Sequence, residues 1–240
     1  KIKFLYYIYY IMDLPHNFFY MLTPILVIIT YLSAYKNGKA VCNRYLVNCL
    51  LYLITSFSIY LSSRQFTKDN IVINTSHVAL LSISTLFMII ALVYSKNIIT
   101  KHILWLLIII ILGIVGRYSK KLNQLNEETI QDILKKMMVI LIICVSFAVL
   151  FPQYIKPSMG FALFIGLLFV ILFRIIDTIF LKKKYDNYIS YIAIFIFSGF
   201  VVYDTDRVLK NAKSCAKTGK ADYLDNMIDM FFNILNLFTN

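Results

Sequence analysis

Acidic and amide side chains recur at helical spacing near the C-terminus of this 240-residue chain. The spacing of three or four positions places six of them on one helical face, while the residues between them are apolar. The six are Asp222, Asp225, Asp229, Asn233, Asn236 and Asn240. Oxygen-bearing side chains suit a hard cation such as calcium and are costly when they face hydrocarbon. The pattern therefore predicts a central helix whose polar face lines a site or a pathway.

A further carboxylate, Asp204, follows a long apolar run. We expect the apolar helix to end there, which would put Asp204 where membrane meets water. Arg207, three positions later, is expected either to pair with Asp204 or to act as a latch. Asp206 and Asp225 are expected at the mouth of the pathway, because two adjacent membrane helices that both present acids can converge on one site.

Another charged pair lies inside the preceding apolar run, where Arg174 and Asp177 are three positions apart. Residues with this spacing share a helical face and can form an ion pair. Arg174 is also within snorkelling reach of the interface. The pair predicts an interfacial salt bridge or a latch in which Arg174 holds a carboxylate.

The elements that position these residues follow from composition, since 60% of the residues are hydrophobic and long apolar runs alternate with short basic connectors. No single soluble core of this size needs so much apolar sequence. We therefore predict an all-α membrane protein, a transmembrane bundle of seven or eight helices with a central C-terminal helix. It forms a single integral membrane domain over residues 1–240, in which 1–17 is a lead-in and 18–240 the helix bundle. Spans are expected at 18–35, 45–63, 78–95, 103–116, 137–155, 159–181, 188–205 and 220–239.

The formal net charge of +12 would suggest nucleic acid in a soluble protein. Here the basic residues lie mainly in connectors such as Lys182, Lys183 and Lys184, where they anchor helices at anionic headgroups. The expected partner is the lipid bilayer, and no nucleic acid is expected. The distribution of Lys and Arg does not decide the orientation in the membrane.

Cysteine and histidine give no sign of a metal or catalytic centre. Cys49 and Cys144 fall in apolar runs, whereas Cys42 and Cys215 fall in connectors, and all four are expected to be packing residues or free thiols. The histidines are scattered and no nucleotide or hydrolase motif is present. We expect no cofactor, no metal beyond a weak calcium site at Asp204, and no enzymatic activity.

Two connectors have distinctive patterns. In 117–136, acids precede bases and an apolar face recurs, which predicts an amphipathic helix running into the fifth span. Pro152 and Pro157 then predict a tight hairpin between the fifth and sixth spans. Gly160 and Gly166, on the sixth, predict close contact with a neighbouring helix.

The C-terminal third, roughly 150–240, resembles the transmembrane Bax inhibitor motif family. The signature run is Gly-Phe-Val-Val-Tyr-Asp-Thr at 199–205, followed without gaps by Asp-Tyr-Leu at 222–224 and Asn-Leu-Phe at 236–238. The segment 156–167 is also similar to the family's hairpin into its antepenultimate helix. Upstream of 150 only the number and size of the helices match.

The resemblance implies a pH-modulated calcium leak channel of intracellular membranes, in the endoplasmic reticulum or Golgi, that modulates apoptosis. Calcium would be the permeant ion, and cell-death regulators or other membrane proteins would be partners. The alternative is a non-conducting membrane protein that regulates host or partner membrane proteins through its spans. Heavy use of Ile, Tyr, Asn, Lys and Phe indicates an AT-rich coding sequence, which suggests a viral or parasite member.

One position departs from the family pattern. The resemblance implies a second aspartate, paired with Asp204 as a pH-sensing couple, at the position that Asn233 occupies. Two carboxylates held close cannot both ionise cheaply, so the loss of one removes proton sharing. We hypothesise that an amide–carboxylate hydrogen bond replaces the couple, and that pH sensing is weakened or relocated to Asp229, one turn earlier. Asp204, Asp229 and Asn233 are the expected pathway or gate residues.

Overall fold

The computed structural model describes residues 16–36, 38–70, 74–118, 127–219 and 221–239. Within these ranges the chain forms eight α-helices, one for each expected span, so the all-α prediction is confirmed. Their bounds are α2 His16–Ala34, α3 Tyr45–Asn70, α4 Thr75–Tyr94, α5 Ile98–Arg117, α7 Glu127–Leu150, α8 Pro157–Ile179, α9 Asp186–Thr218 and α10 Tyr223–Thr239. A short hairpin of β1 (Tyr35–Lys36) and β2 (Lys39–Ala40) and the 3-10 turn η1 (Cys42–Arg44) join α2 to α3. Most of the expected lead-in and Asn240 lie outside the described residues.

Five of the described helices are long and apolar enough to cross a membrane: α3, α4, α5, α8 and α9. The C-terminal helix α10 has 17 residues. At 1.5 Å per residue it is about 25 Å long, which is less than the roughly 30 Å of a bilayer's hydrocarbon core. It therefore depends on the surrounding helices to shield its polar side chains.

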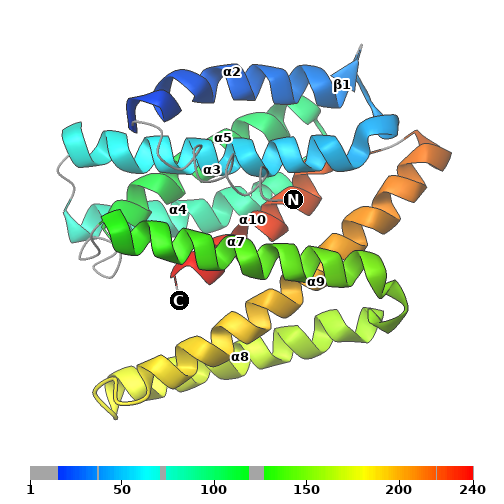
Figure 1. Cartoon of the computed structure of the whole chain (residues 1–240). Coiled ribbons are helices and arrows are strands. Elements are labelled where there is room, and N and C mark those ends of the chain that lie inside the picture. The colour runs from blue at the N-terminus through cyan, green and yellow to red at the C-terminus, as the bar shows by residue number, and fades with distance from the viewer. Residues whose placement is uncertain (1–15, 37, 71–73, 119–126, 220, 240) are drawn as a thin grey trace.

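The helices run back and forth, and α10 lies among the others (Figure 1). It packs on α9 and α3 and also contacts α5 and α7. For residues 223–237 no side chain is fully exposed. The predicted central C-terminal helix is confirmed, because four neighbouring helices pack against it and leave its residues buried or partly buried.

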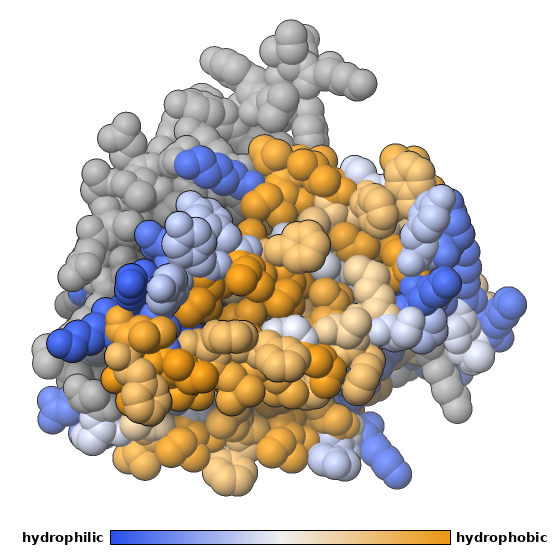
Figure 2. Space-filling view, turned by 90° about the horizontal axis from the view of Figure 1, so that it is seen from below, coloured by the Kyte–Doolittle hydropathy of each residue, from blue (hydrophilic) through white to orange (hydrophobic). Residues whose placement is uncertain are grey.

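The outer helix α8 packs chiefly on α9 and buries only Val170 and Asp177. Its remaining surface carries exposed apolar side chains such as Phe161 and Phe173. Figure 2 shows this apolar face as a broad band with hydrophilic residues at both edges. Such a band fits contact with lipid.

The connection between α7 and α8 contains the 3-10 turn η2 (Pro152–Tyr154) and is short, as the two prolines predict. The two helices do not form the expected packed hairpin, however, since the main partner of each is α9. The expected close contacts of glycine are present. A Cβ added at Gly160 would lie 2.8 Å from the Tyr203 ring, and one at Gly166 would lie 3.1 Å from Ile196 Cδ1.

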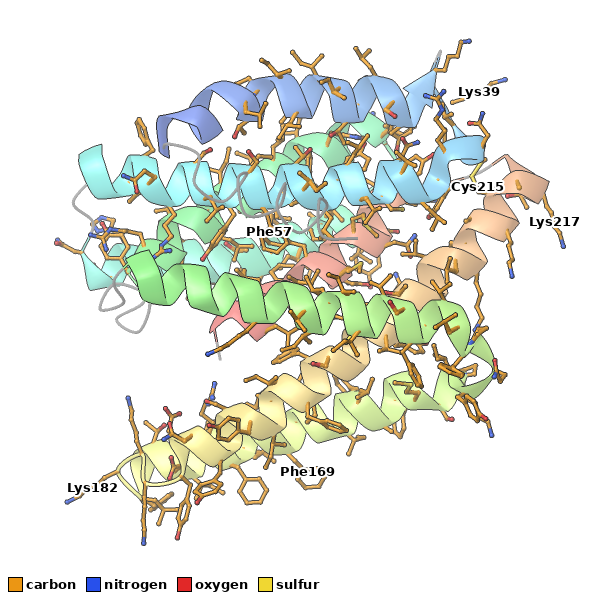
Figure 3. All side chains as sticks on the ribbon, in the orientation of Figure 1. Lys39, Phe57, Phe169, Lys182, Cys215 and Lys217 are labelled. Carbon is orange, nitrogen blue, oxygen red and sulfur yellow. A yellow bond between two sulfur atoms is a disulfide. The ribbon has the colours of Figure 1, made fainter. Side chains whose placement is uncertain are left out.

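The expectation for two of the cysteines was wrong. Cys42, in η1, and Cys215, in the last turn of α9, form a disulfide across 173 positions of sequence. Figure 3 places Cys215 at the end of the bundle that also carries Lys39 and Lys217, opposite Lys182. The pairing was not foreseen because two connectors distant in sequence meet only after the helices pack. Cys49 and Cys144 are buried free thiols, as expected.

Candidate functional site

Asp204 does not lie at a helix end, which corrects the sequence prediction. α9 has 33 residues and is about 50 Å long. It continues past Asp204 because no helix-breaking residue occurs before Gly219, whose φ of 67° gives the left-handed conformation that ends the helix. The Asp204 residue is only 5% exposed, so its carboxylate lies in the bundle interior.

The partner of Asp204 is Asn233 on α10. The Asn233 side-chain amide donates a hydrogen bond to Asp204 Oδ2 over 2.6 Å. An amide–carboxylate contact thus occupies the place where the family resemblance implies two carboxylates. The hydrogen bond also compensates part of the cost of burying the Asp204 charge.

Arg207 connects the same two helices one turn away and does not pair with Asp204. Its Nη1 donates to Asp229 Oδ2 over 2.9 Å, its Nε to Asn226 Oδ1 over 3.0 Å, and its Nη2 to the Asp225 carbonyl over 3.4 Å. Asp229, to which pH sensing was expected to relocate, is bound to this guanidinium. Arg207 reaches α10 since the two helices pack side by side.

Asp206 is separate from the polar face of α10. Its side chain is 6% exposed and its carboxylate lies 2.5 Å from Lys210 Nζ, one turn along α9. It therefore forms an ion pair within its own helix. The expected position of Asp206 at a pathway mouth shared with Asp225 is not found.

Lys101 of α5 holds the acidic start of α10, and sequence reasoning missed it. Its ammonium binds the carboxylates of both Asp222 and Asp225, the second over 2.9 Å. The fourth span was predicted to start at 103, which left Lys101 in a connector, but α5 begins at Ile98. The Asn97 side chain caps it by accepting from two backbone N–H groups. Asn97, as a typical N-cap residue, was the signal in the sequence that this helix begins before Lys101.

Tyrosine side chains lie around the acidic start of α10, at Asp222 and Asp225. Tyr45 Oη accepts a hydrogen bond from Asn226 Nδ2 over 2.8 Å, and Tyr223 Oη donates to the Val41 carbonyl over 2.8 Å. Tyr35, in β1, packs edge-on against the Tyr223 ring at 5.8 Å between centroids. Burial raises the pKa of the Tyr35 phenol, so this group stays neutral at physiological pH. The start of α10 therefore carries tyrosine hydroxyl groups beside the carboxylates of Asp222 and Asp225.

The predicted Arg174–Asp177 pair is absent. Arg174 Nη2 donates to Ser190 Oγ over 3.0 Å and lies 3.9 Å from Asp186 Oδ1. Asp177 instead accepts from the Tyr185 backbone N–H over 3.0 Å and so fixes the α8–α9 turn. Arg174, on α8, contacts the start of α9 through Ser190. Asp204 lies 14 residues further along α9 and is therefore distant from Arg174. Arg174 is thus placed to stabilise the turn and not to latch the α10 acids.

Three contacts therefore join the polar face of α10 to α9 and α5. They are the Asp204–Asn233 hydrogen bond, the Arg207–Asp229 ion pair and the Lys101 bridge. Among the described residues no group of three or more His, Cys, Asp or Glu side chains could enclose a metal ion. The polar face of α10 is thus a row of side-chain oxygens that are already bound by protein donors. A mobile cation would have to compete with these donors for the oxygens.

Comparisons with known proteins agree with this architecture. The family model Bax1-I, described as inhibitor of apoptosis-promoting Bax1, matches residues 38–240. A protein of Vibrio cholerae serotype O1, described as an uncharacterized membrane protein, is 33% identical over 78 residues, which make up 32% of this chain and 32% of that protein. The match spans about a third of the curated relative's length. No solved structure matches the chain at a significant level.

Proposed function

The chain belongs to the Bax1-I family, inhibitors of apoptosis-promoting Bax1, and on this premise we propose that it is a passive calcium leak channel of intracellular membranes. The observation that carries the proposal is the Asp204–Asn233 hydrogen bond inside a bundle of apolar helices. A buried carboxylate in a membrane protein is costly, and such residues typically mark ion pathways or other functional sites. Cation passage beside α10 is such a function.

The pathway begins at the half-exposed acids of α10. The side chains of Asp222, Asp225 and Asp229 are 41%, 39% and 47% exposed. These carboxylates attract cations, and Asp204, deeper in the bundle, is the narrow point. Calcium prefers several oxygen ligands, and Asp204 with the Asn233 carbonyl group offers few. A site with so few ligands binds weakly enough to release the ion, as conduction requires.

The Arg207–Asp229 ion pair serves as the latch. Both side chains are about half exposed, at 40% and 47%. Ion pairs with this exposure contribute only about 0–1 kcal/mol, so thermal motion opens the latch often. A latch that contributes so little stability accounts for a leak better than for a tightly gated channel. Control of the leak then rests on Asp204.

Calcium flux into proteoliposomes that contain an internal calcium indicator tests the proposal. We expect the native protein to give flux well above that of empty vesicles and Asp204→Asn to reduce it severalfold, because the variant keeps the shape but loses the charge. Asp177→Asn is the matched control, since Asp177 is also a buried acid but lies on α8, away from α10. Native flux equal to that of empty vesicles rejects the proposal. Equal loss in both variants rejects the role of Asp204.

The loss of the second carboxylate at position 233 favours one other function. A member that does not conduct would regulate partner membrane proteins, including cell-death regulators, through its spans. The same flux measurement separates the two, because a non-conducting protein gives no flux in any variant. Under either proposal, expression in cells is expected to change their sensitivity to apoptosis, and Asp204→Asn removes that change only if conduction causes it.

A further inference from the structure

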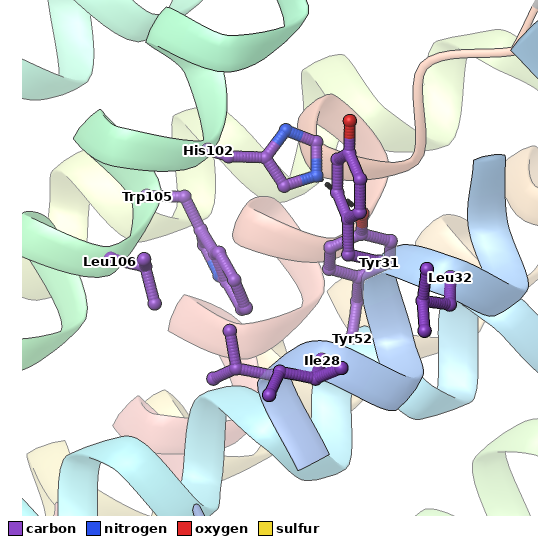
Figure 4. Close-up of a pocket in the computed structure, with 8 residues that line it drawn as sticks. Ile28, Tyr31, Leu32, Tyr52, His102, Trp105 and Leu106 are labelled. Carbon is purple, nitrogen blue, oxygen red and sulfur yellow. Dashed lines mark hydrogen bonds between the residues drawn. The ribbon is translucent and has the colours of Figure 1, made fainter. Parts of the chain in front are cut away.

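A groove on the outside of the bundle has no role in the proposed leak. It lies between α2 and α5, which both pack on α3, and its volume is about 270 Å³. The residues that line it are Val27, Ile28, Tyr31, Leu32, Tyr52, His102, Trp105 and Leu106. Figure 4 shows these side chains converging from the three helices.

The groove opens toward the lipid. Tyr52 and Trp105 form its floor and are 0% and 3% exposed, whereas Ile28 and Leu32 on the rim are 58% and 67% exposed. Ile99 of α5 is likewise 64% exposed. In an integral membrane protein these outer apolar surfaces meet acyl chains.

The lining presents mainly apolar surface, because the polar atoms of Tyr52, His102 and Trp105 already have partners. Tyr52 Oη and His102 Nε2 are hydrogen-bonded over 2.6 Å, and His102 Nδ1 contacts the Ile98 carbonyl over 2.7 Å. Trp105 Nε1 donates to Ser56 Oγ over 3.0 Å. A polar ligand would gain nothing from these groups, whereas an acyl chain would gain van der Waals contacts with the apolar lining.

The groove lies close to one membrane interface. The His102 ring contacts the rings of Tyr31 and Tyr35, with centroids 5.2 and 5.5 Å apart, so the start of α5 lies beside the end of α2. His102 is about one turn from the start of α5, and Trp105 about two turns. Clusters of Tyr and Trp are typical of the headgroup boundary.

Two lysines lie next to the helix ends at this boundary. Lys36 directly follows Tyr35 after α2, and Lys96 directly precedes the capping residue of α5. Both side chains are exposed, and neither has a hydrogen-bond or ion-pair partner in the part of the chain that the structure describes. Basic side chains at this depth attract anionic lipid headgroups.

We propose that the groove binds one acyl chain of an anionic phospholipid whose headgroup lies between Lys36 and Lys96. The volume of about 270 Å³ is slightly below the roughly 300–1,000 Å³ of pockets that hold drug-sized ligands. It suits a segment of a flexible chain. The acyl chain packs on the aromatic floor, and the two ammonium groups attract the anionic headgroup.

Trp105 is the single tryptophan of the chain and reports directly on the groove. The test uses full-length protein in phosphatidylcholine vesicles, with either phosphatidylglycerol or phosphatidylcholine carrying brominated acyl chains that quench tryptophan fluorescence. We expect brominated phosphatidylglycerol to quench at a mole fraction lower by on the order of tenfold. Equal quenching by the two lipids overturns the proposal.

Variants separate the two parts of the site. Lys36→Gln combined with Lys96→Gln is expected to bring the preference for phosphatidylglycerol down to about onefold, while Lys182→Gln with Lys183→Gln, at the opposite end of the bundle, keeps it. Val27→Phe fills the groove and is expected to reduce quenching by both lipids. Leu86→Phe is its control, on an exposed position of α4. Unchanged preference in the first variant, or unchanged quenching in Val27→Phe, overturns the proposal.

The chain's own apolar N-terminal stretch is the other candidate occupant. A variant that lacks residues 1–12 tests it. Selective quenching in both the full-length and the shortened protein supports the lipid site. Selective quenching only in the shortened protein shows that the N-terminal stretch fills the groove, and this overturns the lipid proposal. The readout is lipid contact at Trp105, so failure of this proposal is distinguishable from failure of the proposed leak.

Discussion

Asn233 donates a hydrogen bond to Asp204 over 2.6 Å, and this contact joins α10 to α9 in the bundle interior. Asn233→Leu leaves the buried carboxylate without that donor. Loss of such a hydrogen bond costs about 1–3 kcal/mol, so the thermal midpoint of the purified protein is expected to fall. Adding Asp204→Leu removes both polar partners and is expected to recover most of the loss. An additive further loss in the double variant would contradict this account.

Asn233→Asp is expected to make calcium flux more dependent on pH. Two carboxylates in contact cannot both ionise cheaply, so the pair shares a proton at low pH and separates by repulsion once the proton leaves. Flux of this variant in proteoliposomes should therefore rise with pH, while the native profile stays flatter. Asp229→Asn in the native background is the companion measurement. If it removes the remaining native pH dependence, sensing has been relocated to Asp229; identical native and Asn233→Asp profiles would refute the prediction.

Arg207→Gln opens the proposed latch. The variant removes the cation that binds Asp229, and the half-exposed carboxylate becomes available to calcium. Flux is expected to rise severalfold. The thermal midpoint is expected to fall only slightly, because a pair of this exposure contributes about 0–1 kcal/mol and Asn226 Oδ1 keeps the hydrogen bond from Asn211 Nδ2. Lys210→Gln, which removes the exposed partner of Asp206 on the same helix, is the control and should leave flux unchanged. Reduced flux in Arg207→Gln would exclude a latch.

Lys101→Met removes the positive charge between Asp222 and Asp225. The two carboxylates then repel each other, so the thermal midpoint is expected to fall. Added calcium should restore it more than in the native protein, since an ion that binds only the folded state stabilises it. Lys213→Met, at an exposed position of α9, is the control. A variant that calcium does not stabilise would show that the two acids cannot receive the ion.

The Cys42–Cys215 disulfide closes a loop of 173 positions between η1 and the end of α9. Its removal in Cys42→Ser with Cys215→Ser is expected to lower the free energy of unfolding by about 2–4 kcal/mol. Treatment of the native protein with a reductant should lower the thermal midpoint to that of the double variant. Cys144→Ser, at a free thiol, controls for the substitution itself. An unchanged midpoint after verified reduction would contradict the prediction.

The positions of the helices could be predicted from the sequence because apolar length and helical period are local properties. Every expected span overlaps a helix, although α9 extends well beyond the predicted end, and the polar row from Asp222 to Asn236 correctly marked α10 as the central helix. The Asp204–Asn233 contact was also anticipated, but through the family resemblance and its register. Helical periodicity in a single sequence predicts which residues share a face of a helix. It does not predict which other helix that face contacts.

Partners distant in sequence were decided only by the tertiary structure. Arg207 binds Asp229 on the next helix, where local spacing suggested Asp204, and Lys101 binds two acids that follow it by more than 100 positions. Cys42 meets Cys215 for the same reason. Helical periodicity fixes which side chains share a face, whereas the packing of α3, α5, α9 and α10 fixes which faces meet. Composition and periodicity thus determined a membrane bundle with a polar central helix, and packing determined which charges close it.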